Sequence, residues 1–406
     1  MEKIQENSFS YSALKEISPM KILLLPLFRM PSGHHKAAEA IISHLSSLEE
    51  KIDVKMIDCL SHFHSGIESI VSHAYIKWIS RNPVSYSKFY HSFISPGKRK
   101  ESSFPRFSVC FWDKYFEWRM EKFIKEEAPD FIICTHCYPS KLLNNLKRQG
   151  KTDVPVINVY TDFFMNDIWG KTHIDFHFVP HQEAKEQLIK KYSLKQEQVF
   201  VTGIPIHPAF SKPANDLSGK YVLIAGGNSG LGHLTTLIER LTVEKPTYSY
   251  KILCGNNKKL FDWLRSLQHK KIEPIAYTNC RAKMNRFYEE ASAIITKPGG
   301  ITITEVLEKS LPVFVLGALP GQEEINMDYL KKHRLIYEID VQQSIELQII
   351  QVIDNEIEMN KWYRRLAYYH LEKEMNIENS LLTVLTSKAK TYVSPLKKSA
   401  RDSYLG

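Results

Sequence analysis

Two glycine-containing turns in the second half of the chain each come just before a stretch that can form a helix. Pro298-Gly299-Gly300 leads into a helix from Thr302, and Pro320-Gly321 leads into a helix that carries Gln322. A helix N-terminus presents unpaired backbone N–H groups and the positive end of the helix dipole, and glycine lets an anion approach closely. A diphosphate would be held well there. The alternative is that each glycine–proline pair only separates a strand from the helix that follows it.

A third turn of this kind is the glycine-rich run at residues 226–232, after the apolar segment Tyr221–Ala225. No Lys-Ser or Lys-Thr pair follows it, so it is not a Walker A loop. One glycine-rich loop is weak support for a phosphate site, but a third in the same part of the chain strengthens that interpretation.

The polar residues after these turns favour a ligand-binding role over turns that only separate strands from helices. Gln322, Glu323 and Asn326 come at the spacing of one helix face. Glu305 has two interpretations, because Thr302-Ile-Thr-Glu305 is also the pattern of a capping box, in which the glutamate serves only the helix.

A histidine follows the first apolar segment. Residues 21–27 are typical of a buried strand, and the loop after them opens onto a helix, which is how a doubly wound α/β sheet begins. His34 lies in that loop. An imidazole with an unperturbed pKa near 6.5 suits a general base at neutral pH. The alternative is a helix-capping or solvent-exposed histidine.

The charge of the chain is concentrated in one aromatic segment. Residues 77–125 hold eleven Lys or Arg, four acidic residues and thirteen aromatic residues, which gives +7 of the net charge of +9. Trp112, Phe116, Met120 and Phe123 have the spacing of one helix face. Aromatic and basic side chains together suit an anionic membrane surface, with about 1 kcal/mol per basic residue. A buried aromatic core with a basic rim is the alternative. Nucleic acid is not expected, since no recognised nucleic-acid module occurs.

Length and composition set the remaining limits. The chain has 406 residues, which suits two domains, and 43% of them are hydrophobic. Its longest apolar run, residues 22–28, is far below the roughly 20 residues that span a bilayer. The leader, residues 1–19, does not read as a signal peptide, so a cytoplasmic location is expected. The six cysteines are scattered, and the Cys134–Cys137 pair has no second pair nearby, so a metal site is not expected.

These segments together resemble one family. The run from Ile295 to Glu305, Leu311-Pro312, and Pro320-Gly-Gln-Glu-Glu-Ile-Asn326 are similar to the sugar-nucleotide half of the diacylglycerol glycosyltransferases. That family includes bacterial processive diacylglycerol glucosyltransferases and plant monogalactosyldiacylglycerol synthases, and is related to the peptidoglycan lipid glycosyltransferase MurG. Its N-terminal motifs resemble Ser32-Gly-His-His-Lys-Ala-Ala38, Thr135-His136 and Thr161-Asp162-Phe163. Two departures are Cys137 in place of a proline and Asn166 where histidine is common.

The resemblance implies roles for the matching residues. His34 corresponds to the catalytic base, Glu305 to the residue that holds the ribose, and Gln322 and Glu323 to residues that hold the sugar hydroxyls. The residues expected to bind the UDP-sugar are Gly33, Gly227, Asn228, Ser229, Gly230, Tyr277, Thr278, Pro298, Gly299, Gly300, Thr302, Glu305, Gly321, Gln322, Glu323 and Asn326. The matching residues expected to contact the acceptor are His136, Asp162 and Phe163. We expect Trp112 and Phe116, from the aromatic helix face, to contact it as well.

The implied architecture is an α/β protein with the GT-B fold, in which two Rossmann-like domains face a cleft. We expect an N-terminal acceptor- and membrane-binding domain over residues 20–210 and a UDP-sugar-binding domain over residues 218–358. A last helix over about residues 360–390 is expected to pack back on the first domain.

The implied reaction is the inverting transfer of a hexose, with glucose as the expected sugar, from a UDP-sugar to a lipid hydroxyl such as that of diacylglycerol. The enzyme is expected to associate peripherally with the inner face of the cell membrane, and a homodimer is compatible with this interpretation. No Asp-x-Asp motif occurs, so neither a metal nor another cofactor is expected. The alternatives are a soluble small-molecule acceptor, a UDP-sugar-binding regulator without turnover, and UDP-glucose 2-epimerase-like chemistry.

Overall fold

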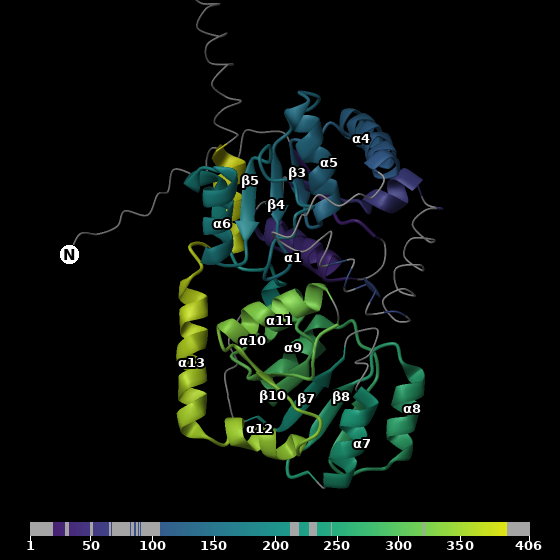
Figure 1. Ribbon diagram of the computed structural model, residues 1–406, viewed down its shortest axis with the longest axis vertical. Coiled ribbons are helices and arrows are strands. Elements are labelled where there is room, and N and C mark those ends of the chain that lie inside the picture. The colour runs from purple at the N-terminus through teal and green to yellow at the C-terminus, as the bar shows by residue number, and fades with distance from the viewer. Residues whose placement is uncertain are drawn as a thin grey trace, which may run out of the picture.

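The structure is a computed structural model, and it describes residues 19–28, 32–48, 52–64, 66, 82, 85–86, 88, 90, 106–211, 219–226, 234–244, 246–319 and 321–387, with side chains in helix α4 from residue 112 onward. The described chain forms two lobes, one above the other (Figure 1). We call the lobe built from residues 19–211 the N-lobe and the lobe built from residues 219–371 the C-lobe.

The N-lobe is a parallel sheet of six strands with helices on its faces (Figure 1). The strand order is β2-β1-β3-β4-β5-β6, with β1 at Met20–Leu25, β2 at Ile52–Met56, β3 at Phe131–Cys134, β4 at Val156–Val159, β5 at Phe176–Val179 and β6 at Val199–Val201. Its helices are α1 at Gly33–Leu48, α4 at Arg106–Glu127, α5 at Cys137–Arg148 and α6 at Gln182–Tyr192, with short 3₁₀ turns η1 at Gln196–Gln198 and η2 at Pro208–Phe210. The central strands β3 and β4 are buried along their whole length, because both faces of the sheet are covered.

The C-lobe repeats the plan. Its six parallel strands run in the order β12-β11-β10-β7-β8-β9, with β7 at Tyr221–Ala225, β8 at Tyr250–Leu253, β9 at Ile272–Ile275, β10 at Ala291–Thr296, β11 at Val313–Val315 and β12 at Ile336–Glu338. Its helices are α7 at Leu234–Glu244, α8 at Lys258–Ser266, α9 at Arg281–Glu289, α10 at Gly300–Glu308, α11 at Gln322–Lys332, α12 at Ile345–Ile353 and α13 at Glu356–Leu371.

Each sheet has one place where the direction of strand addition reverses. In the N-lobe it lies between β1 and β3, where Leu25 pairs with Cys134. In the C-lobe it lies between β7 and β10, where Ala225 pairs with Thr296. Loops leave such a point in opposite directions and open a crevice at the carboxyl ends of the strands, which is where open α/β sheets bind ligands. The GT-B fold expected from the sequence is confirmed.

Two helices, rather than the single helix expected over about residues 360–390, end the described chain. Helix α13 packs on the C-lobe, where the buried Trp362 donates from its indole N–H to the Leu335 carbonyl at 3.0 Å. The chain then leaves helical conformation and forms a second helix over residues 377–387, whose apolar side chains join the N-lobe core around Ile22 and Ile41. The chain therefore crosses between the lobes a second time.

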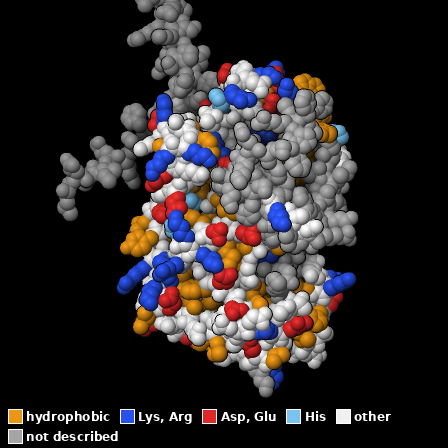
Figure 2. Space-filling view, in the orientation of Figure 1, with side chains coloured by type: hydrophobic (Ala, Val, Ile, Leu, Met, Phe, Trp, Pro, Cys, Tyr) orange, Lys and Arg blue, Asp and Glu red, His pale blue; other side chains and the backbone are white. Residues whose placement is uncertain are grey.

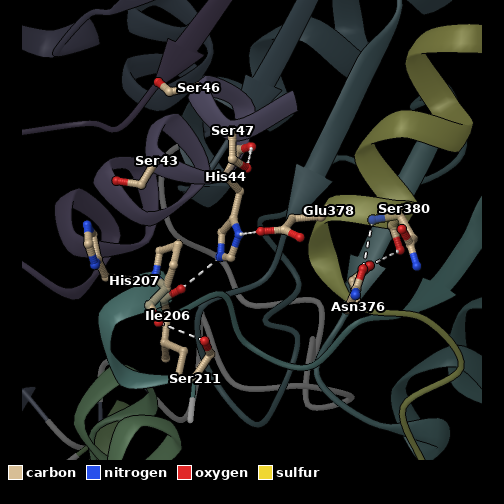
Figure 3. A network of polar contacts seen from close by, with 12 residues as sticks. Ser43, His44, Ser46, Ser47, Ile206, His207, Ser211, Asn376, Glu378 and Ser380 are labelled. Atoms are coloured by element: carbon tan, nitrogen blue, oxygen red, sulfur yellow. Dashed lines mark hydrogen bonds and ion pairs between the residues drawn. The ribbon is translucent and has the colours of Figure 1, made fainter. Parts of the chain in front are cut away.

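His44 of α1 ties this last helix to the N-lobe (Figure 3). Its Nδ1 lies 2.9 Å from the Glu378 carboxylate, and its Nε2 lies 3.0 Å from the Ile206 carbonyl. One buried ring thus joins α1, the end of the N-lobe and the last helix. Within the described ranges, no helix is both long and apolar enough to cross a bilayer.

Candidate active site

His34 lies in the first turn of α1, directly above the reversal point of the N-lobe sheet. Its Nδ1 is 2.8 Å from the Thr135 carbonyl oxygen at the end of β3 and 2.9 Å from Thr161 Oγ1 beyond β4. A carbonyl oxygen can only accept, so we assign the proton of the neutral ring to Nδ1. Nε2 then keeps its lone pair, and this is the tautomer that a general base needs.

Burial keeps this histidine uncharged. Desolvation lowers the pKa of His34 below 6.5, and the nearby charge of Asp162 opposes that shift in part. His136 stands edge-on to the ring with centroids 4.6 Å apart. Burial and the neighbouring His34 also hold the pKa of His136 well below 6.5. His136 caps α5, since its Nδ1 accepts the Tyr138 backbone N–H at 3.1 Å.

Asp162 joins the two lobes directly. The Gln322 side-chain amide donates to both of its carboxylate oxygens at 2.7 Å, and the Asn326 amide donates to one of them at 2.9 Å. The Asn326 carbonyl oxygen accepts the Phe163 backbone N–H at 2.9 Å. Both ends of the Asn326 side chain are therefore used by the N-lobe in this conformation, and its role toward a donor sugar stays a prediction.

Phe163 is buried between the lobes. Its ring stacks on Tyr329 of α11 with centroids 5.3 Å apart, and Tyr329 stacks on its other side against His181 at 4.1 Å. The His181 Nε2–H donates to the Phe163 carbonyl at 2.8 Å. An N-lobe pair of rings thus encloses a C-lobe ring, and the contact of Phe163 with an acceptor stays a prediction.

Gly300 begins α10 at a point where this helix contacts the N-lobe. A Cβ at this position would lie 2.1 Å from the Thr161 carbonyl oxygen, so only glycine fits. Gly299 precedes the helix, no side chain caps the helix start, and a Cβ at Gly299 would meet nothing within 4 Å. The capping box considered for Thr302 and Glu305 does not form, because the N-cap residue is Gly299. The start of α10 is therefore open on the side of Gly299 and closed against the N-lobe on the side of Gly300.

Glu305 and Glu323 are the acidic residues that the sequence predicts to bind the UDP-sugar, and both lie in the C-lobe. Glu305 is buried, accepts the Tyr288 hydroxyl at 3.0 Å, and has its pKa raised by burial. Glu323 accepts the Leu319 backbone N–H at 2.8 Å, and burial also raises its pKa. Gly321 adopts φ 96°, a backbone conformation that favours glycine.

The other predicted donor residues lie around this centre. Gly33 approaches the C-lobe, since a Cβ on it would lie 3.4 Å from Ile301. Pro298 precedes the N-cap of α10. Tyr277 and Thr278 follow β9, at the same edge of the sheet, and Tyr277 is exposed. The predicted ligands Gly227, Asn228, Ser229 and Gly230 lie outside the described residues, as does most of the segment over 77–105.

The aromatic face expected on α4 is partly core. Phe116, Met120 and Phe123 are buried in the N-lobe, and the Phe116 ring meets Tyr138 of α5 edge-on at 5.9 Å. The membrane interpretation is therefore wrong for these three residues, because the apolar stripe packs against the sheet. Trp112 and Trp118 are the exposed aromatic residues of the described part of α4, at 49% and 53%. Over the described surface that Figure 2 shows, acidic and basic side chains are interspersed.

Sequence reasoning missed several groups. Thr135 acts through its backbone carbonyl, which no residue type reveals. Tyr288 lies in no motif that the sequence analysis singled out. Arg281 of α9 forms an ion pair with Glu39 of α1 at 2.6 Å across the lobes, and a charge pair so distant in sequence carries no local signal.

Two doubly wound lobes that meet at their carboxyl edges, with a neutral histidine on one side and an uncapped helix start on the other, define the class of GT-B glycosyltransferases. Comparison with known proteins specifies the family. The sequence profile of the monogalactosyldiacylglycerol (MGDG) synthase family matches residues 34–206. The chain is 40% identical over 319 residues to YkoN, an uncharacterized glycosyltransferase of Bacillus subtilis, covering 78% of this chain and 83% of the relative. The chain belongs to the diacylglycerol glycosyltransferase family and is a glycosyltransferase.

Two further likenesses concern the sequence and the fold, respectively. The chain is 28% identical over 291 residues to a processive diacylglycerol beta-glucosyltransferase of Bacillus cereus, covering 69% of this chain and 72% of the relative. Its fold is similar to the crystal structure of MurG from Acinetobacter baumannii, with a TM-score of 0.56, 13% identity and coverage of 91% of this chain and 100% of the other.

Proposed function

We propose that this protein transfers glucose from UDP-glucose to the hydroxyl of a membrane lipid such as diacylglycerol, with inversion at the anomeric carbon. One observation carries the proposal. His34 is held by the Thr135 carbonyl with Nε2 unprotonated, and it stands across the lobe boundary from the open start of α10. The likeness to processive diacylglycerol beta-glucosyltransferases supports the choice of sugar and acceptor.

The reaction is a single displacement. His34 Nε2 takes the proton from the acceptor hydroxyl as its oxygen bonds to the anomeric carbon, and the bond from that carbon to the β-phosphate oxygen breaks. General-base help of this kind contributes typically about 10²–10⁴-fold. The departing UDP gains negative charge, which the N–H groups and dipole at the start of α10 stabilise. Attack opposite the leaving group inverts the configuration.

The acceptor is reached at a membrane surface. Trp112 and Trp118 are exposed on α4 of the N-lobe. Lys122 and Lys125 on the same helix are also exposed, and each forms an ion pair with a glutamate one turn away. Indole rings suit the headgroup level of a bilayer, and basic side chains are attracted to anionic lipids. We place the protein on the cytoplasmic face of the membrane, where UDP-sugars would be available to it.

The test is incubation of the purified protein with radiolabelled UDP-glucose or UDP-galactose and diacylglycerol vesicles, followed by lipid extraction. We expect label in the lipid phase from UDP-glucose. His34→Ala should abolish this product while the Kd for UDP stays within about twofold, because the ring faces the acceptor side. Full turnover in His34→Ala, or labelled product only with soluble acceptors, would contradict the proposal.

A further inference from the structure

Tyr288 makes a buried contact with the carboxylate implied to hold the nucleotide. It lies in the last turn of α9 and is 4% exposed. Its hydroxyl donates to Glu305 Oε2 at 3.0 Å, joining α9 to the second turn of α10. Neither residue type nor spacing suggested a role for this tyrosine, since it belongs to none of the glycine-marked turns.

The carboxylate of Glu305 is otherwise free to meet a ligand. Among the described residues, the Tyr288 hydroxyl is the one hydrogen-bond donor to it, and it uses only Oε2. Lys36 of α1 and Arg281 of α9 act on Glu305 through their positive charges alone. Oε1 has no donor among the described residues and keeps some exposed surface. Oε1 is therefore the oxygen that a hydroxyl group of a ligand can reach.

Packing fixes the Tyr288 ring and leaves its hydroxyl to make one directed contact. The ring belongs to the buried core of the C-lobe and meets the Phe210 ring with centroids 5.7 Å apart. A ring held in a close-packed core has little freedom to move. The hydrogen bond from its hydroxyl therefore helps to set where the Glu305 carboxylate lies.

We propose that Tyr288 is a positioning residue for the nucleotide: its hydroxyl holds Glu305 Oε2, so that Oε1 is presented to a ribose hydroxyl of the UDP-sugar. This inference rests on the proposed use of a UDP-sugar and adds to it the group that orients the ribose ligand. A tyrosine hydroxyl suits the task because it donates one hydrogen bond in a direction set by a rigid ring.

The test compares Tyr288→Phe with Tyr221→Phe in the full chain. Tyr221 is an apt control, since it is also buried in the C-lobe and its hydroxyl donates a single hydrogen bond, to the Phe287 carbonyl at 3.1 Å. Calorimetry gives the Kd for UDP, 2′-deoxy-UDP and 3′-deoxy-UDP with each protein. Phenylalanine keeps the ring and removes only the oxygen, and a melting curve for each variant checks that it folds.

We expect Tyr288→Phe to weaken UDP binding about three- to tenfold, the range for one lost hydrogen bond, and Tyr221→Phe to leave it unchanged. For one of the two deoxy nucleotides the loss should shrink to less than about twofold, because the hydroxyl that Glu305 would accept is then missing. In the glucosyl transfer assay KM for UDP-glucose should rise and kcat should stay nearly constant.

Two results would overturn the role of Tyr288. One is equal UDP affinity in the two variants. The other is an equal loss for UDP and both deoxy nucleotides, which would show general damage to the C-lobe. A wild-type protein that binds no UDP at all would instead overturn the proposed donor site, and the role of Tyr288 with it.

Discussion

The contact between Gly300 and the N-lobe predicts a large effect of one methyl group. A Cβ on residue 300 would lie 2.1 Å from the Thr161 carbonyl oxygen, 3.0 Å from the Thr161 carbonyl carbon and 3.1 Å from Ile204 Cδ1. Real Cβ atoms essentially never come closer than 3.0 Å, so in Gly300→Ala the lobes must separate by about 0.9 Å at this point. The neighbouring atoms are backbone, which cannot simply rotate away.

The separation acts on catalysis because His34 and the start of α10 lie on opposite sides of it. A misplacement of about 1 Å can lower the rate about 10²-fold, so we expect kcat of Gly300→Ala to fall by about that factor. The assay is glucosyl transfer to diacylglycerol at saturating UDP-glucose. A crystal structure of the variant should show α10 further from the Thr161 backbone than in the wild type.

Gly299→Ala is the matched comparison for geometry. Its Cβ would meet nothing within 4 Å, so this substitution should leave the lobe separation unchanged. Any loss of UDP affinity in Gly299→Ala would instead report the close approach of a phosphate to that glycine. A wild-type kcat and an unchanged distance between α10 and the Thr161 backbone in Gly300→Ala would refute the steric argument.

Four further outcomes are expected. Because burial lowers the pKa of His34 and the base must be neutral, kcat/KM should fall with acidification only below pH 6.5, as a pH profile will show. The same lowered pKa values of His34 and His136 mean that the unfolded chain binds protons that the folded chain does not, so the free energy of unfolding should drop as pH falls below about 6.5 in denaturant titrations. Thr161→Val removes one contact to His34 Nδ1 and should lower kcat about three- to tenfold without changing the Kd for UDP. Trp118→Ala should weaken sedimentation with anionic vesicles while UDP binding is unaffected.

The fold was predictable because its signals are local. Apolar runs followed by glycine turns marked β1, β7 and β10, and parallel strands bring the loops after them to one edge. The placement of His34 and Gly300 near that edge followed from the same pattern. The steric requirement for glycine at position 300 could not be predicted from that pattern, since it comes from the close approach of the Thr161 backbone.

Contacts between the lobes could not be predicted from local pattern. Asp162 and Gln322 are 160 positions apart, and each alone looks like an ordinary polar residue after a strand or before a helix. The apolar stripe of α4 was visible in the sequence, but its partner could not be predicted. Its spacing is the same whether the face meets a membrane or a protein core, and only the structure shows Phe116 inside.

The chain returns to the N-lobe after α13 (Figure 1). Because Tyr329 of the C-lobe stacks on both Phe163 and His181 of the N-lobe, any change in the angle between the lobes has to alter these ring contacts. The same change has to bend the short segment that joins α13 to the last helix.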